Sequence, residues 1–235
     1  MKRVVTPYTV VSDKVPRTLS FGVISDFHNG SLEGLLDSLP KVDAILMPGD
    51  LINRHWLGMA RAEELLRRAT AMAPTFVSLG NHEWRSKEAA AFREVLERSD
   101  AVVLDNCWQA FEGIRIGGLT AEKKEKDPGR FLQEKSPAFS LLLCHHPEDF
   151  PRYVAPYAPD LTLAGHAHGG QIQIRGRGLY APGQGLFPTY THGFYHDRKL
   201  LVSRGATNSS GMPRWGNPCE IIHLTIRKDH DAEAN

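Results

Sequence analysis

The sequence predicts an α/β fold in which two β-sheets pack face to face and helices cover the outside. In the first half, apolar β-branched runs alternate with apolar residues at helical spacing, whereas short strands with few helices follow Ser99. This change of pattern indicates a second sheet packed on the first. The chain has 235 residues, of which 41% are apolar, so we expect one good-sized core and a single domain over residues 1–235.

Five apolar runs are typical of buried strands, and each run ends at a polar loop. They are residues 19–25, 44–47, 75–79, 139–144 and 161–164. Three sets of apolar residues recur at helical spacing: Leu32, Leu35, Leu36 and Leu39; Ala62, Leu65, Leu66 and Ala69; Ala89, Phe92 and Leu96. The pattern in the first half of the chain therefore predicts strands that alternate with helices.

The second half of the chain predicts shorter strands and two long loops. The strands are residues 101–104, 114–117, 171–174, 200–203 and 220–225. The loops are residues 120–136, which are rich in charge, and residues 180–198, which are rich in glycine and aromatic residues. Loops of this length in a compact enzyme border the active site or are disordered. The polar residues 228–235 predict a disordered tail.

The totals of charge and cysteine exclude some classes of protein. Lys and Arg number 28 against 27 for Asp and Glu, a formal net charge of +1, so nucleic acid is not an expected partner. Cys107, Cys144 and Cys219 are far apart, as in a cytosolic protein with reduced thiols. Residues 1–16 contain no apolar stretch long enough for a signal peptide or a membrane span. We therefore expect a cytoplasmic protein without a membrane span, and the oligomeric state stays open.

Polar clusters rich in Asp and His follow five of the predicted strands. They are Asp-Phe-His at 26–28, Gly-Asp at 49–50, Gly-Asn-His-Glu at 80–83, His-His-Pro at 145–147 and Gly-His-Ala-His at 165–168. Each cluster lies at the carboxyl end of its strand, where the crevices of α/β sheets form. We expect the clusters to meet in one site.

The side chains in these clusters suit divalent metal ions. Carboxylate, imidazole and amide groups bind Mn²⁺, Fe or Zn²⁺, and no cysteine accompanies them to favour a softer site. A single Zn²⁺ site uses about three or four protein ligands. Seven candidates therefore favour two ions with one bridging carboxylate, which we assign to Asp50. We expect manganese, with Fe, Zn, Co or Ni as alternatives.

The ordered clusters resemble the calcineurin-like metallophosphoesterase superfamily. Its pattern is D-x-H, G-D, G-N-H-[D/E], a lone His and G-H-x-H, and all five blocks occur in that order within residues 21–171. The run GHAHGGQI, with Ser-Arg-Gly at 203–205 and Gly-Asn-Pro at 216–218, is similar to a bacterial group whose better-known members carry an N-terminal membrane anchor. We expect no such anchor in this sequence. The resemblance implies a four-layer αββα fold.

The resemblance also implies a role for each residue of the site. The first metal would be bound by Asp26, His28 and His168, and the second by Asn81, His145 and His166, with Asp50 between them. His82 would be the catalytic residue that contacts the phosphate and protonates the leaving oxygen. The implied reaction is attack on phosphorus by a hydroxide that bridges the metals, without a phosphoenzyme intermediate.

The sequence also offers candidate contacts to substrate. Many relatives have a second Asp three residues after the G-D block, where this chain has Asn53, and we expect this change to affect only the surroundings of the metals. Asn53, His55 and Glu83 are therefore candidates for substrate binding, and Glu83 is also a candidate for orienting His82. His146 is the less favoured ligand of the two adjacent histidines.

The leading hypothesis is a dinuclear metal-dependent phosphodiesterase that acts on a small-molecule or lipid-linked phosphate ester. A cyclic-nucleotide phosphodiesterase and a phosphomonoesterase are alternatives, because the same five blocks serve all three. A nuclease ranks lower, since no basic stripe with interleaved aromatic residues is present. A non-catalytic interaction module would lack some metal ligands, and here all seven positions are filled.

Overall fold

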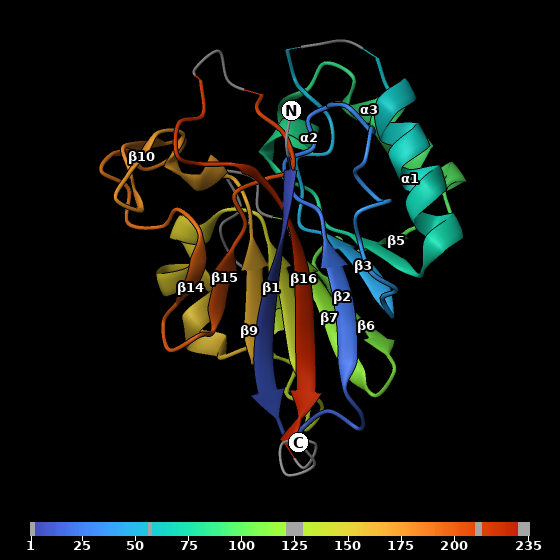
Figure 1. Ribbon diagram of the computed structural model, residues 1–235. Coiled ribbons are helices and arrows are strands. Elements are labelled where there is room, and N and C mark those ends of the chain that lie inside the picture. The colour runs from blue at the N-terminus through green and yellow to red at the C-terminus, as the bar shows by residue number, and fades with distance from the viewer. Residues whose placement is uncertain (1–2, 56–57, 121–128, 210–212, 230–235) are drawn as a thin grey trace.

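A computed structural model describes residues 3–55, 58–120, 129–209 and 213–229 of the chain. In this part of the chain, two six-stranded sheets lie face to face, and two hairpins of two strands each lie beside them (Figure 1). Helices flank the pair of sheets, so the predicted two-sheet α/β sandwich is confirmed.

The first sheet has the strand order β1-β16-β2-β3-β4-β5. Its strands are β1 (Arg3–Ser12), β16 (Cys219–Lys228), β2 (Leu19–Val23), β3 (Ala44–Met47), β4 (Thr75–Val77) and β5 (Val102–Val103). Strands β2 to β5 run parallel, and β16 is antiparallel to β2. All residues of β3 and β4 are buried, as in strands that are covered on both faces.

The second sheet has the strand order β14-β15-β9-β8-β7-β6. Its strands are β14 (Gly193–Tyr195), β15 (Leu200–Val202), β9 (Leu161–Ala164), β8 (Ser140–Cys144), β7 (Ile114–Leu119) and β6 (Cys107–Phe111). Strands β7, β8, β9 and β15 run parallel, and antiparallel strands close both edges.

Helices pack against the outer faces of the two sheets. The α-helices are α1 (Ala60–Met72), α2 (Asn81–Arg85), α3 (Ala89–Arg98) and α4 (Gly129–Gln133), and the short helices of other types are η1 (Pro147–Asp149), η2 (Phe150–Val154), η3 (Ala155–Tyr157) and η4 (His168–Gly170). Helices α1 and α3 present Leu65, Leu66 and Phe92 to the first sheet. None of the helices in the described residues is both long and apolar enough to span a membrane.

Three apolar layers hold these elements together. Phe21, Leu46 and Leu143 belong to the central layer between the sheets and are fully buried. A second layer lies under α1 and α3, and a third lies on the outer face of the second sheet, where Phe150 and Val154 of η2 pack. Burial of apolar surface of this extent is the main favourable term in folding. The sequence of layers is therefore helix, sheet, sheet, helix.

Most of the predicted elements are present, with shifts of up to three residues at their ends. The five early strand runs correspond to β2, β3, β4, β8 and β9, and two of the three helical patterns correspond to α1 and α3. The helix predicted from Leu32 to Leu39 is wrong. This segment forms successive turns instead, with i to i+3 bonds such as Leu35 N to Leu32 O, and Gly34 in it has a φ of 64° that an α-helix excludes.

Other differences concern the edges of the sheets and the loops. Strands β1 and β6 were not among the predicted elements, and β5 and β16 join the first sheet although they follow Ser99. The predicted 180–198 loop contains β12 (Tyr180–Ala181), β13 (Gly185–Leu186) and β14. In the predicted 120–136 loop, α4 occupies 129–133 and residues 121–128 lie outside the described residues. Lys228 pairs with Ser12 at the end of β16, so the ordered chain extends into the predicted 228–235 tail, whose residues 230–235 also lie outside the described residues.

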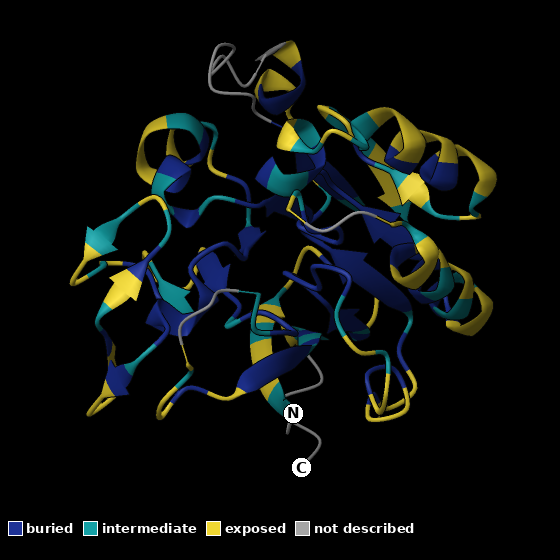
Figure 2. Ribbon diagram, turned by 90° about the horizontal axis from the view of Figure 1, so that it is seen from above, coloured by how far each residue is buried: buried dark blue, intermediate teal, exposed yellow. Residues whose placement is uncertain are grey.

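The carboxyl ends of β2, β3 and β9 point toward one end of the sandwich (Figure 1). Seen from that end, the connecting segments in the middle of the molecule are buried, and exposed residues lie on the surrounding helices and loops (Figure 2). The polar clusters predicted from the sequence follow these strands and lie in this buried centre.

Candidate metal centre

Five loops at the carboxyl ends of the strands bring the seven predicted ligands to one edge of the sandwich. Asp26, Asp50, Asn81, His145 and His166 follow β2, β3, β4, β8 and β9. His28 and His168 lie two residues beyond the first and the last of these. All seven side chains are buried. Burial of so many polar groups requires strong compensating interactions.

Asp26 faces three histidines through one carboxylate oxygen. Its Oδ1 lies 3.8 Å from Nε2 of His28, 3.6 Å from Nε2 of His168 and 3.9 Å from Nε2 of His145. Its Oδ2 accepts a 2.7 Å hydrogen bond from the hydroxyl of Ser25. The serine thus holds the carboxylate so that Oδ1 points into the cluster.

Asp50 is arranged in the same way. Its Oδ2 lies 3.1 Å from Nε2 of His145, 3.8 Å from Nε2 of His28 and 3.9 Å from Nε2 of His82. Its Oδ1 accepts a 2.8 Å hydrogen bond from the backbone N–H of His82. Asp26 and Asp50 therefore lie between the histidines of the β2 loop and those of the β8 loop.

A second group of ligand atoms lies on the other side of the carboxylates. His145, His146 and His166 have ring nitrogens within 4.8 Å of one another. His146 Nε2 donates a 2.9 Å hydrogen bond to Oδ1 of Asn81 and so joins this residue to the group. An amide oxygen has two lone pairs, and one remains free for a cation.

The backbone of the site is held in an uncommon conformation. Asp26, His28, Asp50, His166 and His168 all have φ between 47° and 65°, the left-handed region that residues with a side chain rarely adopt. Such outliers persist only where the surrounding structure enforces them, and they concentrate at functional sites. The strained turns aim each side chain inward from the end of its strand.

Hydrogen bonds fix the tautomers of two of the histidines. Nδ1–H of His28 donates to the carbonyl of Ile52 over 3.3 Å, and Nδ1–H of His145 donates to the carbonyl of Pro48 over 3.0 Å. In the neutral form of either ring, Nε2 then carries a lone pair and lies within 3.9 Å of oxygens of Asp26 and Asp50. Nε2 of His145 is buried and lies 3.1 Å from Oδ2 of Asp50. A backbone carbonyl on the other ring nitrogen is the usual support for a metal-binding histidine.

His168 differs from these two histidines. Arg214 donates a 3.1 Å hydrogen bond to its Nδ1, so the neutral ring carries its proton on Nε2, which lies 3.3 Å from Nε2 of His28. That proton must leave Nε2 before the nitrogen can bind a cation. Nδ1 can accept the proton only when Arg214 gives up its hydrogen bond.

Burial and the nearby charges shift the pKa values of the clustered histidines and of Asp50. Burial lowers the pKa of His28 to about 3 and, with the positive charge of Arg214, lowers that of His168 to about 3. Burial also opposes protonation of His145, but the charges of Asp50 and Asp26 outweigh it and raise the His145 pKa to about 10. Despite burial, His145 holds the pKa of Asp50 well below its ordinary value. The proton on His145 thus partly neutralises the negative charge of the carboxylates in the cluster.

The residues fit divalent cations. Imidazole nitrogens and carboxylate oxygens converge in a buried space, and Nε2 of His145 lies 3.1 Å from Oδ2 of Asp50. Carboxylate and imidazole ligands suit Mn, Fe and Zn ions. The candidate ligand atoms form four overlapping groups of three residues. Asp26, Asp50, His28 and His145 each belong to two of these groups, so the cluster is larger than a single metal site requires.

His82 lies beside the cluster and is partly open to solvent. Its Nδ1 accepts a 3.1 Å hydrogen bond from the backbone N–H of Arg54, so the neutral ring carries its proton on Nε2. Its side chain is 14% exposed, and its ring centroid lies 4.4 Å from that of His28. Burial lowers the pKa of His82 from its ordinary value. The Nε2–H group is placed to donate to a ligand bound at the cluster.

The three candidate substrate contacts lie in different environments. Asn53 is buried and its Oδ1 accepts the backbone N–H of His55, so it stabilises a turn. His55 is exposed on the rim, with its ring centroid 6.2 Å from that of His82. Glu83 is buried, and its carboxylate accepts hydrogen bonds from four backbone N–H groups. These bonds occupy both carboxylate oxygens, so the carboxylate does not orient the His82 ring. Of these three side chains, only that of His55 is exposed to solvent.

Several residues of the site were not assigned from the sequence. His146 bonds Asn81, and Arg214 bonds His168. Glu148 places Oε1 3.7 Å from Nε2 of His166. Thr207 donates its hydroxyl to the carbonyls of Asp26 and Phe27. Of these residues, only His146 could have been found from the sequence, because it is adjacent to His145. Arg214 and Thr207 lie far along the chain from the residues that they contact.

A buried cluster of carboxylates and imidazole nitrogens at one edge of a two-sheet α/β sandwich defines a metal-binding protein. The family model described as calcineurin-like phosphoesterase matches residues 19–170. The chain belongs to this family, which confirms the resemblance seen in the sequence.

Curated bacterial proteins are similar to most of the chain. An "Uncharacterized metallophosphoesterase" of Helicobacter pylori (strain 26695) is 26% identical over 239 residues, which cover 94% of this chain and 63% of that protein. "Uncharacterized metallophosphoesterase YkuE" of Bacillus subtilis is 27% identical and covers 80% of this chain and 68% of its own. "Phosphodiesterase YaeI" of Escherichia coli is 24% identical and covers 73% and 66%. The chain thus spans under two thirds of the length of the Helicobacter relative.

Among solved structures, a metallophosphoesterase from Sphaerobacter thermophilus is 18% identical, with a TM-score of 0.37. The alignment covers 64% of this chain and 61% of that one.

Proposed function

We propose that the chain is a metal-dependent phosphoesterase that holds two divalent cations and acts as a phosphodiesterase. The observation that carries the proposal is the position of Asp26 and Asp50, whose inward oxygens lie between two groups of histidine nitrogens. The name of the Escherichia coli relative, a phosphodiesterase, supports the choice of reaction.

Each cation would have its own set of residues. Asp26, His28 and His168 would hold one cation, and Asn81, His145 and His166 would hold the other. Asp50 would contribute to both. Bound there, divalent cations neutralise phosphate charge and lower the pKa of bound water toward about 7. Manganese suits the donor set, which contains no thiol.

The residues around the cluster would position the substrate and move one proton. The backbone N–H of Arg54 keeps the proton of His82 on Nε2, which faces the cluster. From this position His82 donates the proton to the oxygen that leaves phosphorus, since cleavage otherwise produces an alkoxide. His55 on the rim is the candidate contact to the rest of a small-molecule or lipid-linked phosphate ester.

A substrate panel tests the proposal. Purified protein with Mn²⁺ should hydrolyse bis(p-nitrophenyl) phosphate, lose activity when EDTA is added and regain it with excess Mn²⁺. Parallel assays with p-nitrophenyl phosphate and cyclic AMP separate monoester and cyclic-nucleotide hydrolysis from general diester hydrolysis. Asp50→Asn is the matched variant without activity. Absence of hydrolysis of all three compounds with Mn, Fe, Zn, Co and Ni ions would overturn the proposal.

A further inference from the structure

Five large apolar side chains that are exposed to solvent belong to segments of the chain that are joined by backbone hydrogen bonds. Leu186, Phe187 and Trp215 are 72%, 78% and 75% exposed, and Ile174 and Tyr180 are also exposed. The other exposed large apolar residues, Val11, Met72 and Val102, lie far apart in the chain on different elements. Single exposed apolar residues are ordinary, whereas a cluster marks an interaction surface.

Two hairpins hold the cluster in place. The first consists of β10 (Gln173–Ile174) and β11 (Arg177–Gly178), and the second consists of β12 and β13. Tyr180 is paired directly with Leu186 across the second hairpin, so their side chains leave the same face. The lobe that carries β10 projects from the sandwich in Figure 1. We call residues 172–190 together with Trp215 the hairpin lobe.

Backbone hydrogen bonds join the parts of the hairpin lobe. The N–H of Gln173 donates to the carbonyl of Trp215 over 2.8 Å, which places the backbone of Trp215 beside β10. The N–H of Phe187 donates to the carbonyl of Leu179 over 2.9 Å, and the N–H of Leu179 donates to the carbonyl of Ile172 over the same distance. The exposed apolar residues therefore share one continuous support.

The charge of the hairpin lobe has one sign. Arg175 and Arg177 flank the tip of the first hairpin, and both are exposed. Residues 171–196 contain neither Asp nor Glu, although the whole chain carries almost equal numbers of acidic and basic residues. The segment thus combines exposed apolar side chains with arginines and contains no acidic residue. This combination complements a surface that has negatively charged groups on the outside and apolar groups beneath them.

The hairpin lobe borders the metal centre. The N–H of Leu179 also donates to the carbonyl of Gly170, which ends the short helix η4 that begins with His168. At Gly183, a side chain would collide with Glu148 and come within 3.0 Å of Nε2 of His166. A partner on the lobe would thus lie next to the site.

We propose that the hairpin lobe docks onto an anionic lipid bilayer. Leu186, Phe187 and Trp215 enter the boundary between headgroups and acyl chains, and Arg175 and Arg177 contact the lipid phosphates. Aromatic rings and arginines are favoured at this boundary because each combines an apolar body with a polar or charged end. Docking goes beyond the proposed function, since it requires neither metal ions nor hydrolysis.

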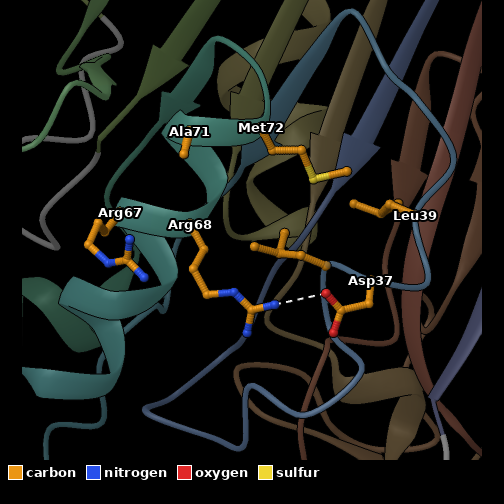
Figure 3. A pocket seen from close by; sticks show the side chains of 7 residues that line it. Asp37, Leu39, Arg67, Arg68, Ala71 and Met72 are labelled. Carbon is orange, nitrogen blue, oxygen red and sulfur yellow. Dashed lines mark hydrogen bonds and ion pairs between the residues drawn. The ribbon is translucent and has the colours of Figure 1, made fainter.

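A second surface provides the contrast. A pocket of about 380 Å³ lies between α1 and the turns at residues 36–39 (Figure 3). Its rim carries both signs of charge, with Arg68 paired to Asp37 at 2.9 Å. Met72 lines this pocket and is 42% exposed. The mixed charge does not complement an anionic bilayer, so Met72 supplies a control position.

Sedimentation with vesicles tests the proposal. The protein, in EDTA, should sediment with vesicles of equal parts phosphatidylcholine and phosphatidylglycerol, and much less with phosphatidylcholine alone. Leu186→Ser combined with Phe187→Ser should reduce the fraction bound to the mixed vesicles at least about 10-fold. Arg175→Gln combined with Arg177→Gln should reduce the preference for the anionic vesicles by about 10-fold.

Matched variants control for general effects of composition. Met72→Ser removes an exposed apolar side chain outside the lobe, and Arg67→Gln with Arg98→Gln removes two exposed charges from α1 and α3. These should bind vesicles as the wild type does, and thermal unfolding should show that all variants are folded.

The proposal is overturned if wild-type protein binds neither vesicle or if lobe and control variants bind equally. It is also overturned if the lobe variants abolish a dimer seen by analytical ultracentrifugation while vesicle binding is unchanged. Because EDTA is present throughout, failure here is distinguishable from failure of the phosphoesterase assay.

Discussion

Oε2 of Glu83 accepts the backbone N–H of Asp50 over 2.9 Å and that of Gly80 over 2.7 Å. Its other oxygen, Oε1, accepts the N–H groups of Leu51 and Ile52. One buried carboxylate therefore ties the loop after β3, which carries Asp50, to the start of α2, which carries His82. Glu83 is a structural support of the site rather than a contact to substrate.

Glu83→Gln should destabilise the protein by about 1–3 kcal/mol, because the amide NH₂ would face two N–H donors and leave them without an acceptor. Urea unfolding of the metal-free protein measures the loss. The matched control is Glu94→Gln on the exposed face of α3, which should change stability by less than about 0.5 kcal/mol. Equal stabilities of the two variants would contradict the role given to Glu83.

Asp50→Asn and His82→Gln should separate metal binding from proton transfer. Asp50 contributes the oxygen that lies between the histidine groups, so Asp50→Asn should lose bound metal, measured by mass spectrometry of the desalted protein. His82 lies beside the cluster with Nε2–H free to donate, so His82→Gln should keep its metal and lose about 10²–10⁴-fold in turnover. Loss of metal from His82→Gln, or retention of metal by Asp50→Asn, would reverse the two roles.

The sequence predicted much of this site because the relevant residues directly follow apolar strands. Asp26, Asp50 and His145 come at the carboxyl ends of β2, β3 and β8, and parallel strands that end at one edge bring such residues together. Local pattern and sheet geometry were sufficient for these residues. The same reasoning predicted helices α1 and α3 from their apolar spacing.

Other features depend on contacts that no local pattern records. Arg214 reaches His168 across 46 positions of sequence, and β1 exists because its whole length pairs with β16 near the other end of the chain. The turns at residues 33–38 have the apolar spacing of a helix, but Gly34 adopts a left-handed conformation. Glu83 has the position of a group that could orient His82, and only its four backbone donors reveal the different role.

The tautomers of His28 and His168 should differ in the metal-free protein. The carbonyl of Ile52 keeps the proton of His28 on Nδ1, and Arg214 keeps the proton of His168 on Nε2. Long-range ¹H–¹⁵N correlation spectra of histidine-labelled protein distinguish the two forms. Addition of Zn²⁺, which is diamagnetic, should move the His168 proton to Nδ1 and leave His28 in its original form. His28→Gln and His168→Gln assign the two signals, and identical tautomers before metal addition would contradict the hydrogen-bond assignment.

Metal binding should release a proton near neutral pH, and that proton should come from His145. Its pKa of about 10 means that the metal-free ring is charged at pH 7, whereas His28 and His168, with pKa values of about 3, are already neutral. A cation must displace the proton from Nε2 of His145, so metal affinity should rise with pH up to about 10. Calorimetric titration with Mn²⁺ in buffers of different ionisation enthalpy gives the number of protons released.

The same group should make the stability of the metal-free protein depend on pH with a definite sign. The folded-state pKa of His145 is raised from 6.5 to about 10, so its favourable ion pair with Asp50 contributes fully below pH 6.5 and is lost as the pH rises toward 10. Urea unfolding in EDTA at a series of pH values should show this decline, and His145→Asn should reduce it. With saturating Mn²⁺ the decline should disappear, because the cation replaces the proton as the positive partner of Asp50. A decline of equal size in the wild type and in His145→Asn would assign it to other groups and remove the basis for proton release at this residue.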